Sequence, residues 1–142
     1  MKSFVYVSNT WLLAVLLHPF IFLFGTILFG GEMPDEILFV IAVLGFFFSL
    51  PAYFLCIVCL PGVLSMKANI VFQFLSWLFA ISTCVFVCDI LLSLLFGSSL
   101  DVLKETIVLS LPGLIAAWIS AVIRFNQFKN LFTENHEAEY IN

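Results

Sequence analysis

Asp89 is the residue of this chain whose chemistry most needs an explanation. It lies in CVFVCDILLS (84–93), and no other charged residue occurs between Lys67 and Asp101. Ionisable side chains inside such long apolar stretches are costly and commonly mark ion or proton pathways. Three interpretations are open: Asp89 lines a water-filled path or proton relay, hydrogen-bonds Ser, Thr or Trp across a helix or subunit boundary, or reaches headgroup water.

His18 is the second candidate for proton chemistry, because imidazole readily changes charge near neutral pH. It precedes Pro19 in another apolar run. If the outer ends of the two helices are level, His18 and Asp89 differ in depth by about 7 Å, and if the inner ends are level, by about 20 Å. One hypothesis is a His18–Asp89 proton pair, and the other is a histidine that packs between helices.

The four cysteines have a residue type that can bind metals or exchange electrons. Cys56 and Cys59 form a CxxC motif, and Cys84 and Cys88 lie four residues apart in a later run. If both helices start near the same membrane face, Cys56 lies about 6 Å deep and Cys84 about 24 Å deep. One ion cannot bridge that separation, so we expect small apolar packing residues, no metal and no cofactor.

No catalytic signature accompanies these residues. The sequence contains no Gly-rich phosphate loop, HExxH, GxSxG or acidic pair at a plausible spacing. We therefore predict that the protein is not an enzyme. Its net charge of −4 offers no basic patch, which argues against nucleic acid as a partner.

The elements that position these side chains are long apolar runs. Hydrophobic residues make up 63% of the 142 residues and charged residues only 10%, whereas a soluble domain is about half apolar and a quarter charged. The runs cover about 10–30, 36–60, 69–96 and 103–124, and a helix crosses a bilayer with about 20 residues. The sequence predicts an all-α polytopic membrane protein, with a bundle of four transmembrane helices within residues 1–132.

Breaker-rich joints separate the runs. They are GGEMPDE (30–36), LPGVLSMKAN (60–69) and GSSLD (97–101). Pro34 suits the first helical position, and Ser99 could cap the last helix. The loops are therefore expected to be short.

The distribution of basic residues predicts the orientation, since Lys and Arg favour the cytoplasmic side. Only Lys104 would lie on the opposite side. Both termini are expected in the cytoplasm of a multi-pass cell-membrane protein, the inner membrane if the source is bacterial. The basic residues that share the cytoplasmic side are Lys2, Lys67, Arg124 and Lys129.

The segment after the last run is expected to lie outside the bilayer core. Phe125, Phe128 and Phe132 continue a helical stripe past the membrane edge, at the interface or against a partner. Residues 133–142, TENHEAEYIN, form an acidic cytoplasmic tail. The tail is either a disordered end or a docking peptide for a cytosolic protein.

Small residues recur at helical spacing in the second and fourth runs. Such stripes let helix backbones approach closely in lipid. The pattern predicts close packing, against either a helix of the same chain or one of another copy. The stripes are Ala42, Gly45, Ser49, Ala52, Cys56 and Cys59 in the second run, and Gly113, Ala117 and Ala121 in the fourth.

The third run has two polar faces at about 100° per residue. It is therefore expected either at the centre of its own bundle or between its bundle and a neighbouring subunit. An oligomer satisfies both faces most simply, so we expect a homo-oligomer. One face carries Gln73, Ser76, Ala80, Thr83 and Cys84, and the other carries Ser82, Asp89 and Ser93.

Prolines inside three runs predict kinks, because proline lacks an N–H and crowds the preceding turn. They are Pro19, Pro51 and Pro112, and the hydroxyls of Ser49 and Ser110 are placed to bond the freed groups. The kinks serve either bundle curvature or gating.

Two classes of function fit this reading. In the first, the protein self-assembles and acts as a membrane-embedded sensor, scaffold or membrane-perturbing component beside a cytosolic partner. In the second, it is a small oligomeric ion channel or proton-coupled transporter that uses Asp89, either alone or together with His18. In size and four-span layout the chain resembles the small membrane subunits of bacterial defence systems, such as the Kiwa membrane component. That resemblance implies a soluble partner and a role in antiphage defence.

Overall fold

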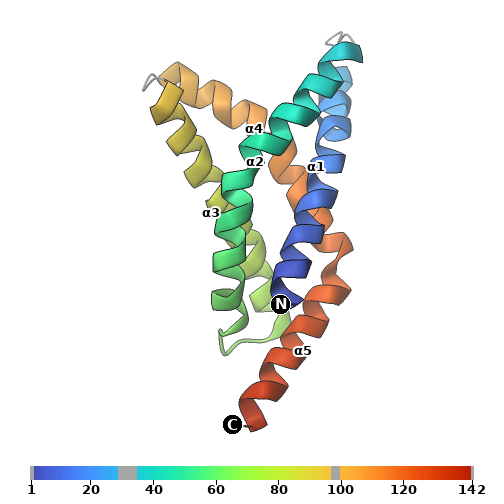
Figure 1. Ribbon diagram of the computed structural model, residues 1–142, viewed down its shortest axis with the longest axis vertical. Coiled ribbons are helices and arrows are strands. Elements are labelled where there is room, and N and C mark those ends of the chain that lie inside the picture. The colour runs from blue at the N-terminus through green and yellow to red at the C-terminus, as the bar shows by residue number, and fades with distance from the viewer. Residues whose placement is uncertain (1, 29–34, 97–99, 142) are drawn as a thin grey trace.

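The computed structural model is an all-α chain, and its helices are labelled in Figure 1. The structure describes residues 2–28, 35–96 and 100–141, with side chains for 2–28, 39–40, 43–95 and 110–134. The expected Ser99 cap and most of the first joint lie outside the described residues. The helices are α1 (Lys2–Leu28), α2 (Asp35–Leu64), α3 (Ile70–Phe96), α4 (Leu100–Ile123) and α5 (Phe125–Ile141).

Three of the described helices are long and apolar enough to cross a membrane. The qualifying segments are Lys2–Leu28, Val43–Leu64 and Ile70–Leu95, and the apolar part of α4, Ser110–Ile123, is shorter. Helix is the natural form for such segments because each backbone group bonds within its own segment.

Prolines lie inside α1, α2 and α4 without ending them. The expected joint at 60–69 begins later than predicted, because Pro61 is inside α2 and the helix continues to Leu64. Asn69 then caps α3, and its Oδ1 accepts a hydrogen bond from the Phe72 N–H at 2.8 Å.

The four long helices contact one another in sequential order around the molecule. Helix α1 packs against α2 and α4, and α3 packs against α2 and α4. The α1–α2 pair and the α3–α4 pair diverge away from the end that holds the chain's N-terminus (Figure 1). We call that end the base, and it is formed by the start of α1, the α2–α3 connection and the α4–α5 junction.

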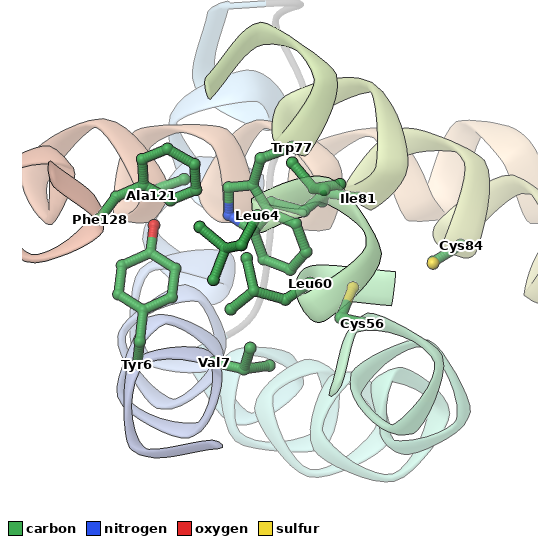
Figure 2. Close-up of a cluster of buried hydrophobic side chains, with 11 residues drawn as sticks. Tyr6, Val7, Cys56, Leu60, Leu64, Trp77, Ile81, Cys84, Ala121 and Phe128 are labelled. Carbon is green, nitrogen blue, oxygen red and sulfur yellow. The ribbon is translucent and has the colours of Figure 1, made fainter. Parts of the chain in front are cut away.

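The hydrophobic core lies at the base and draws on all five helices (Figure 2). Trp77 and Phe128 are its largest fully buried side chains. The Tyr6 ring lies 6.3 Å from the Trp77 ring and 6.0 Å from the Phe128 ring, between centroids. The core comprises Tyr6, Val7, Cys56, Leu60, Val63, Leu64, Trp77, Ile81, Cys84, Ala121 and Phe128.

Helix α5 closes the base by inserting Phe128 into this core. The Phe128 ring also lies 5.3 Å from that of Phe74 on α3, so the predicted aromatic stripe docks on the bundle. The chain stays helical to Ile141, so residues 133–141 continue α5. An exposed ion pair between Lys2 Nζ and Glu134 Oε1, at 2.6 Å, joins α5 to the start of α1.

Candidate functional site

Asp89 is buried and hydrogen-bonded between two helices. Its side chain is 7% exposed, and its Oδ2 accepts a hydrogen bond from Ser110 Oγ at 2.6 Å, from α3 to α4. This distance is typical of a hydroxyl that donates to a carboxylate. The contact is the one that an interhelical role for Asp89 requires, and it gives Ser110 a partner other than the backbone group freed by Pro112.

His18 lies between two glycines of neighbouring helices. A Cβ atom built on Gly45 of α2 would stand 2.8 Å from His18 Cε1 and closer still to Nδ1. A Cβ atom built on Gly113 of α4 would stand 3.8 Å from His18 Cδ2 and 3.9 Å from Nε2. The two small-residue stripes therefore leave a slot that the imidazole of α1 fills.

The Nε2 atom of His18 is buried and has no hydrogen-bond partner among the described residues. A buried polar atom without a partner is costly, so such atoms often mark sites of function or bound water. His18 Nε2 does not bond Asp89, and the predicted proton pair is not a direct contact.

His18 and Asp89 nevertheless meet α4 on neighbouring turns. His18 faces Gly113, and Asp89 bonds Ser110, which lies three residues earlier. Residues three apart on a helix are neighbours on its surface, about 5–6 Å between their Cβ atoms. We call this part of the molecule, defined by His18, Gly45, Asp89, Ser110 and Gly113, the polar level.

The stripe of α2 and the stripe of α4 both pack inside the chain. Ser49 Oγ accepts a hydrogen bond from Trp11 Nε1 of α1 at 3.0 Å, and Ala52 is buried. Ala121 is fully buried in the base core, with Ala117 packed against that core. The side chain of Ala42 lies outside the described residues. For the described members, the partner helices belong to the same chain.

Both polar faces of α3 also contact the same chain. On one face, Gln73 Nε2 donates to the carbonyl of Leu64 at the end of α2 and to that of Met66 in the α2–α3 connection. On the other, Ser82 Oγ accepts a hydrogen bond from Trp118 Nε1 of α4 at 3.1 Å. Helix α3 packs against α2 and α4, as α1 does, and side chains on both of its polar faces form hydrogen bonds within the chain.

The large difference in depth that was expected between the cysteines of α2 and those of α3 is wrong. Cys59 Sγ lies 3.9 Å from Cys84 Sγ. The inner ends of α2 and α3 are not level, because α2 runs on to Leu64 and Gln73 in the first turn of α3 bonds the end of α2. The described residues still contain no group of three or more His, Cys, Asp or Glu side chains placed to hold a metal ion.

A second set of buried polar atoms lies at the base. Tyr6 Oη, Gln73 Oε1 and Trp77 Nε1 are buried without a hydrogen-bond partner in the described part of the chain. Tyr6 and Trp77 were not among the residues predicted from the sequence. A usable signal was the four-residue spacing of Tyr6, Thr10, Ala14 and His18, which places all four on one face of α1.

A shallow groove runs beside these atoms, between the start of α1 and α5. Its volume is about 300 Å³, and the Lys2–Glu134 ion pair lies along it. The other lining residues are Val5, Tyr6, Gln127, Asn130 and Leu131.

The described residues thus combine a bonded carboxylate, an unpartnered imidazole and a thiol pair inside apolar helices. The chain matches no protein-family model, no curated protein and no solved structure.

Proposed function

We propose that this chain is a non-enzymatic integral membrane protein whose embedded helices act as a scaffold or sensor beside a soluble partner. In this proposal four helices cross the membrane. The lengths and apolar composition of α1, α2 and α3 support three of the crossings. The packing of α4 against both α1 and α3 supports a fourth.

The proposed orientation places the base and both termini on the cytoplasmic side. Lys67 lies in the α2–α3 connection and Arg124 at the α4–α5 junction, while Lys2 and Lys129 lie on α1 and α5. All four therefore belong to the base, and basic residues favour the cytoplasmic face. Helix α5 would then face the cytosol, where a soluble partner could reach it.

The observation that carries the scaffold proposal is the hydrogen bond between Ser110 and Asp89. A carboxylate that is 7% exposed and bonded across two helices favours one arrangement of those helices. The Trp11–Ser49 and Trp118–Ser82 hydrogen bonds join further helix pairs in the same way. Polar atoms used in this manner hold the bundle together and leave no need for a chemical step.

Two substitutions of Asp89 test this proposal. Asp89→Asn keeps an oxygen that can accept the Ser110 hydrogen bond, whereas Asp89→Leu removes that acceptor from the part-buried Ser110 hydroxyl. The scaffold proposal expects Asn to retain most of the stability and Leu to lose about 1–3 kcal/mol. Thermal unfolding in detergent and yield after membrane extraction measure the difference. Equal stability of the two variants, with ion flux lost in Asn, contradicts the scaffold proposal.

Self-assembly and the soluble partner are parts of the proposal with their own tests. A second copy would pack against exposed apolar side chains on the outside of the bundle, such as Phe47, Phe54 and Val58 on α2. Light scattering of the protein in lipid nanodiscs gives the copy number. A role in antiphage defence, implied by the resemblance in layout, predicts fewer phage plaques only when the soluble partner is expressed as well.

A second candidate function, proton or ion transport, is favoured by one observation. The unpartnered Nε2 of His18 on α1 and the carboxylate of Asp89 on α3 face neighbouring turns of α4. Against an open conduit, Phe128 and the base core fill the cytoplasmic end of the bundle. Proton flux into liposomes driven by a membrane potential decides between the two functions, because the transport candidate requires flux that Asp89→Asn and His18→Ala both abolish.

A further inference from the structure

Cys59 and Cys84 form a pair of facing thiols between α2 and α3. Their sulfur atoms are 3.9 Å apart, although 25 positions separate them in sequence. A disulfide has an S–S distance of about 2.05 Å and needs Cα atoms that are already close. The remaining approach of about 2 Å is within reach of side-chain rotation and small helix movements. Packing alone does not use the reactivity of this pair.

The two thiols differ in their exposure. Cys84 is buried together with Cys56 and Cys88, whereas Cys59 is only partly buried. Cys59 also lies five residues before the end of α2 at Leu64, or about 8 Å along the helix axis. It is therefore the thiol that a small molecule from the base or from the surrounding lipid reaches first.

The sulfur atoms of α2 offer Cys84 two neighbours. Cys56 lies one turn from Cys59 on the same helix, and it also approaches Cys84. Cys88 lies one turn further along α3 (Figure 2 shows the placement of Cys56 and Cys84). Only the Cys59–Cys84 pair combines facing sulfur atoms with a partly exposed member, so the pair has the layout of a peroxidatic and a resolving cysteine.

We infer that Cys59 and Cys84 are an oxidative modification site, at which a small uncharged peroxide converts the two thiols to a disulfide. Cys59 Sγ attacks one peroxide oxygen, the O–O bond breaks, and water leaves as Cys59 becomes a sulfenic acid. Cys84 Sγ then attacks the Cys59 sulfur, the S–O bond breaks, and a second water leaves as the S–S bond forms. The two thiols lose two hydrogens and two electrons, and one hydrogen peroxide becomes two waters.

The disulfide would join the last turns of α2 to the middle of α3, since Cys59 lies five residues before Leu64 and Cys84 lies 14 residues after Ile70. The bond would restrict movement of the end of α2, from Pro61 to Leu64, relative to α3. The side chain of Gln73 on α3 already bonds Leu64 there. Oxidation would thus tie together the two helices that have no other covalent link than residues 65–69. This site goes beyond the scaffold role, which does not depend on it.

The test measures free thiols in the full-length protein in lipid nanodiscs. The protein is treated with hydrogen peroxide, denatured and alkylated with N-ethylmaleimide. Mass spectrometry of the intact chain then counts the alkylated cysteines. The variant Cys56→Ala/Cys88→Ala keeps only Cys59 and Cys84, and we expect most of its molecules to lose both alkylation sites and to regain them after dithiothreitol. The unsubstituted protein should lose two of its four alkylation sites. This result does not depend on whether the variant folds correctly.

The matched control is Cys56→Ala/Cys84→Ala, which keeps Cys59 and Cys88 and should retain both alkylation sites or show sulfenic acid alone. Retention of both sites in the Cys56→Ala/Cys88→Ala variant would overturn the inference. So would a bond between Cys56 and Cys84 in the unsubstituted protein, or a disulfide-linked dimer on a non-reducing gel. The scaffold proposal stands or falls on the Asp89 variants instead, so the two failures are distinguishable.

Discussion

The base of the molecule and the polar level are built on opposite principles. At the base, large side chains fill the space between helices, with Trp77, Phe128 and Leu60 fully buried. At the polar level the helices approach through missing side chains, since Gly45 and Gly113 flank one imidazole. The base is bound by ring packing and the polar level by directed contacts such as the Ser110–Asp89 hydrogen bond.

The base and the polar level should therefore respond differently to substitution. Volume-filled cores lose much stability when a side chain is truncated, because the cavity collapses only in part. Close backbone approach responds instead to added volume, since overpacking displaces neighbours. The base therefore fixes how the five helices sit together, and in that frame His18 of α1 and Asp89 of α3 are held against neighbouring turns of α4.

The largest expected effect is at the base. Phe128→Ala removes a fully buried ring and should destabilise the fold by about 3–5 kcal/mol. Thermal unfolding in detergent, followed by circular dichroism, measures the loss. Phe79→Ala is the matched control, because that ring is 74% exposed and has few neighbours to lose. Equal losses for the two variants would mean that the base core does not determine stability.

The next effect probes the polar level by adding volume. Gly45→Ala places a methyl group against the imidazole of His18 and should cost about 1–3 kcal/mol. Gly113→Ala should cost less, since its added Cβ atom would meet the ring at an ordinary 3.8 Å. Gly25→Ala is the control, because nothing lies within 4 Å of a Cβ atom there.

A double variant sharpens this test of the slot. If the imidazole is what Gly45→Ala strikes, His18→Ala should remove most of the cost, and the two changes should be strongly non-additive. Additive losses in thermal unfolding would show that some other neighbour of Gly45 is responsible. The comparison with the base would then lose its main support.

The sequence predicts the helical class and the placement of the polar residues better than their partners. Apolar runs and breakers locate α2 and α3 to within a few residues, because segment length and hydrophobicity decide them. Helix α1 begins at Lys2, well before the expected run, and its added turns bring Tyr6 and Val7 into the base core. Gly45 and Gly113 were predicted to permit close packing, and the structure supplies the side chain that fills the space, His18.

The error in the cysteine depths has a physical cause, which is the relative height of antiparallel helices. Sequence spacing fixes positions along a helix but not the level at which two helices meet. The continuation of α2 past Pro61 and the side-chain bonds of Gln73 set the α2–α3 offset, and this offset brings Cys59 to Cys84. Tertiary contacts of this kind are invisible to periodicity.

A smaller effect is expected from a tryptophan that links two helices. Trp118→Phe keeps most of the ring but removes the Nε1–H donor to Ser82, and hydrogen bonds between helices in membranes are worth about 0.6 kcal/mol on average. Trp11→Phe, which loses the donor to Ser49, is the parallel case on the α1–α2 pair. Chemical unfolding in mixed micelles measures both. A loss above about 2 kcal/mol would place these contacts in the class of the base core.

The smallest effect is expected at the edge of the base, where Lys2 pairs with Glu134. The side chains are 72% and 48% exposed, and ion pairs that face water are worth about 0–1 kcal/mol because solvent and salt screen them. Lys2→Ala should therefore change the unfolding temperature little, and the remaining difference should vanish at high salt. The effect of Lys2→Ala should be much smaller than that of Phe128→Ala, because Phe128 keeps α5 in the core whether or not the ion pair forms. If Lys2→Ala released α5, as shown by new proteolytic cleavage after Lys129, the ion pair and not the aromatic core would hold that helix at the base.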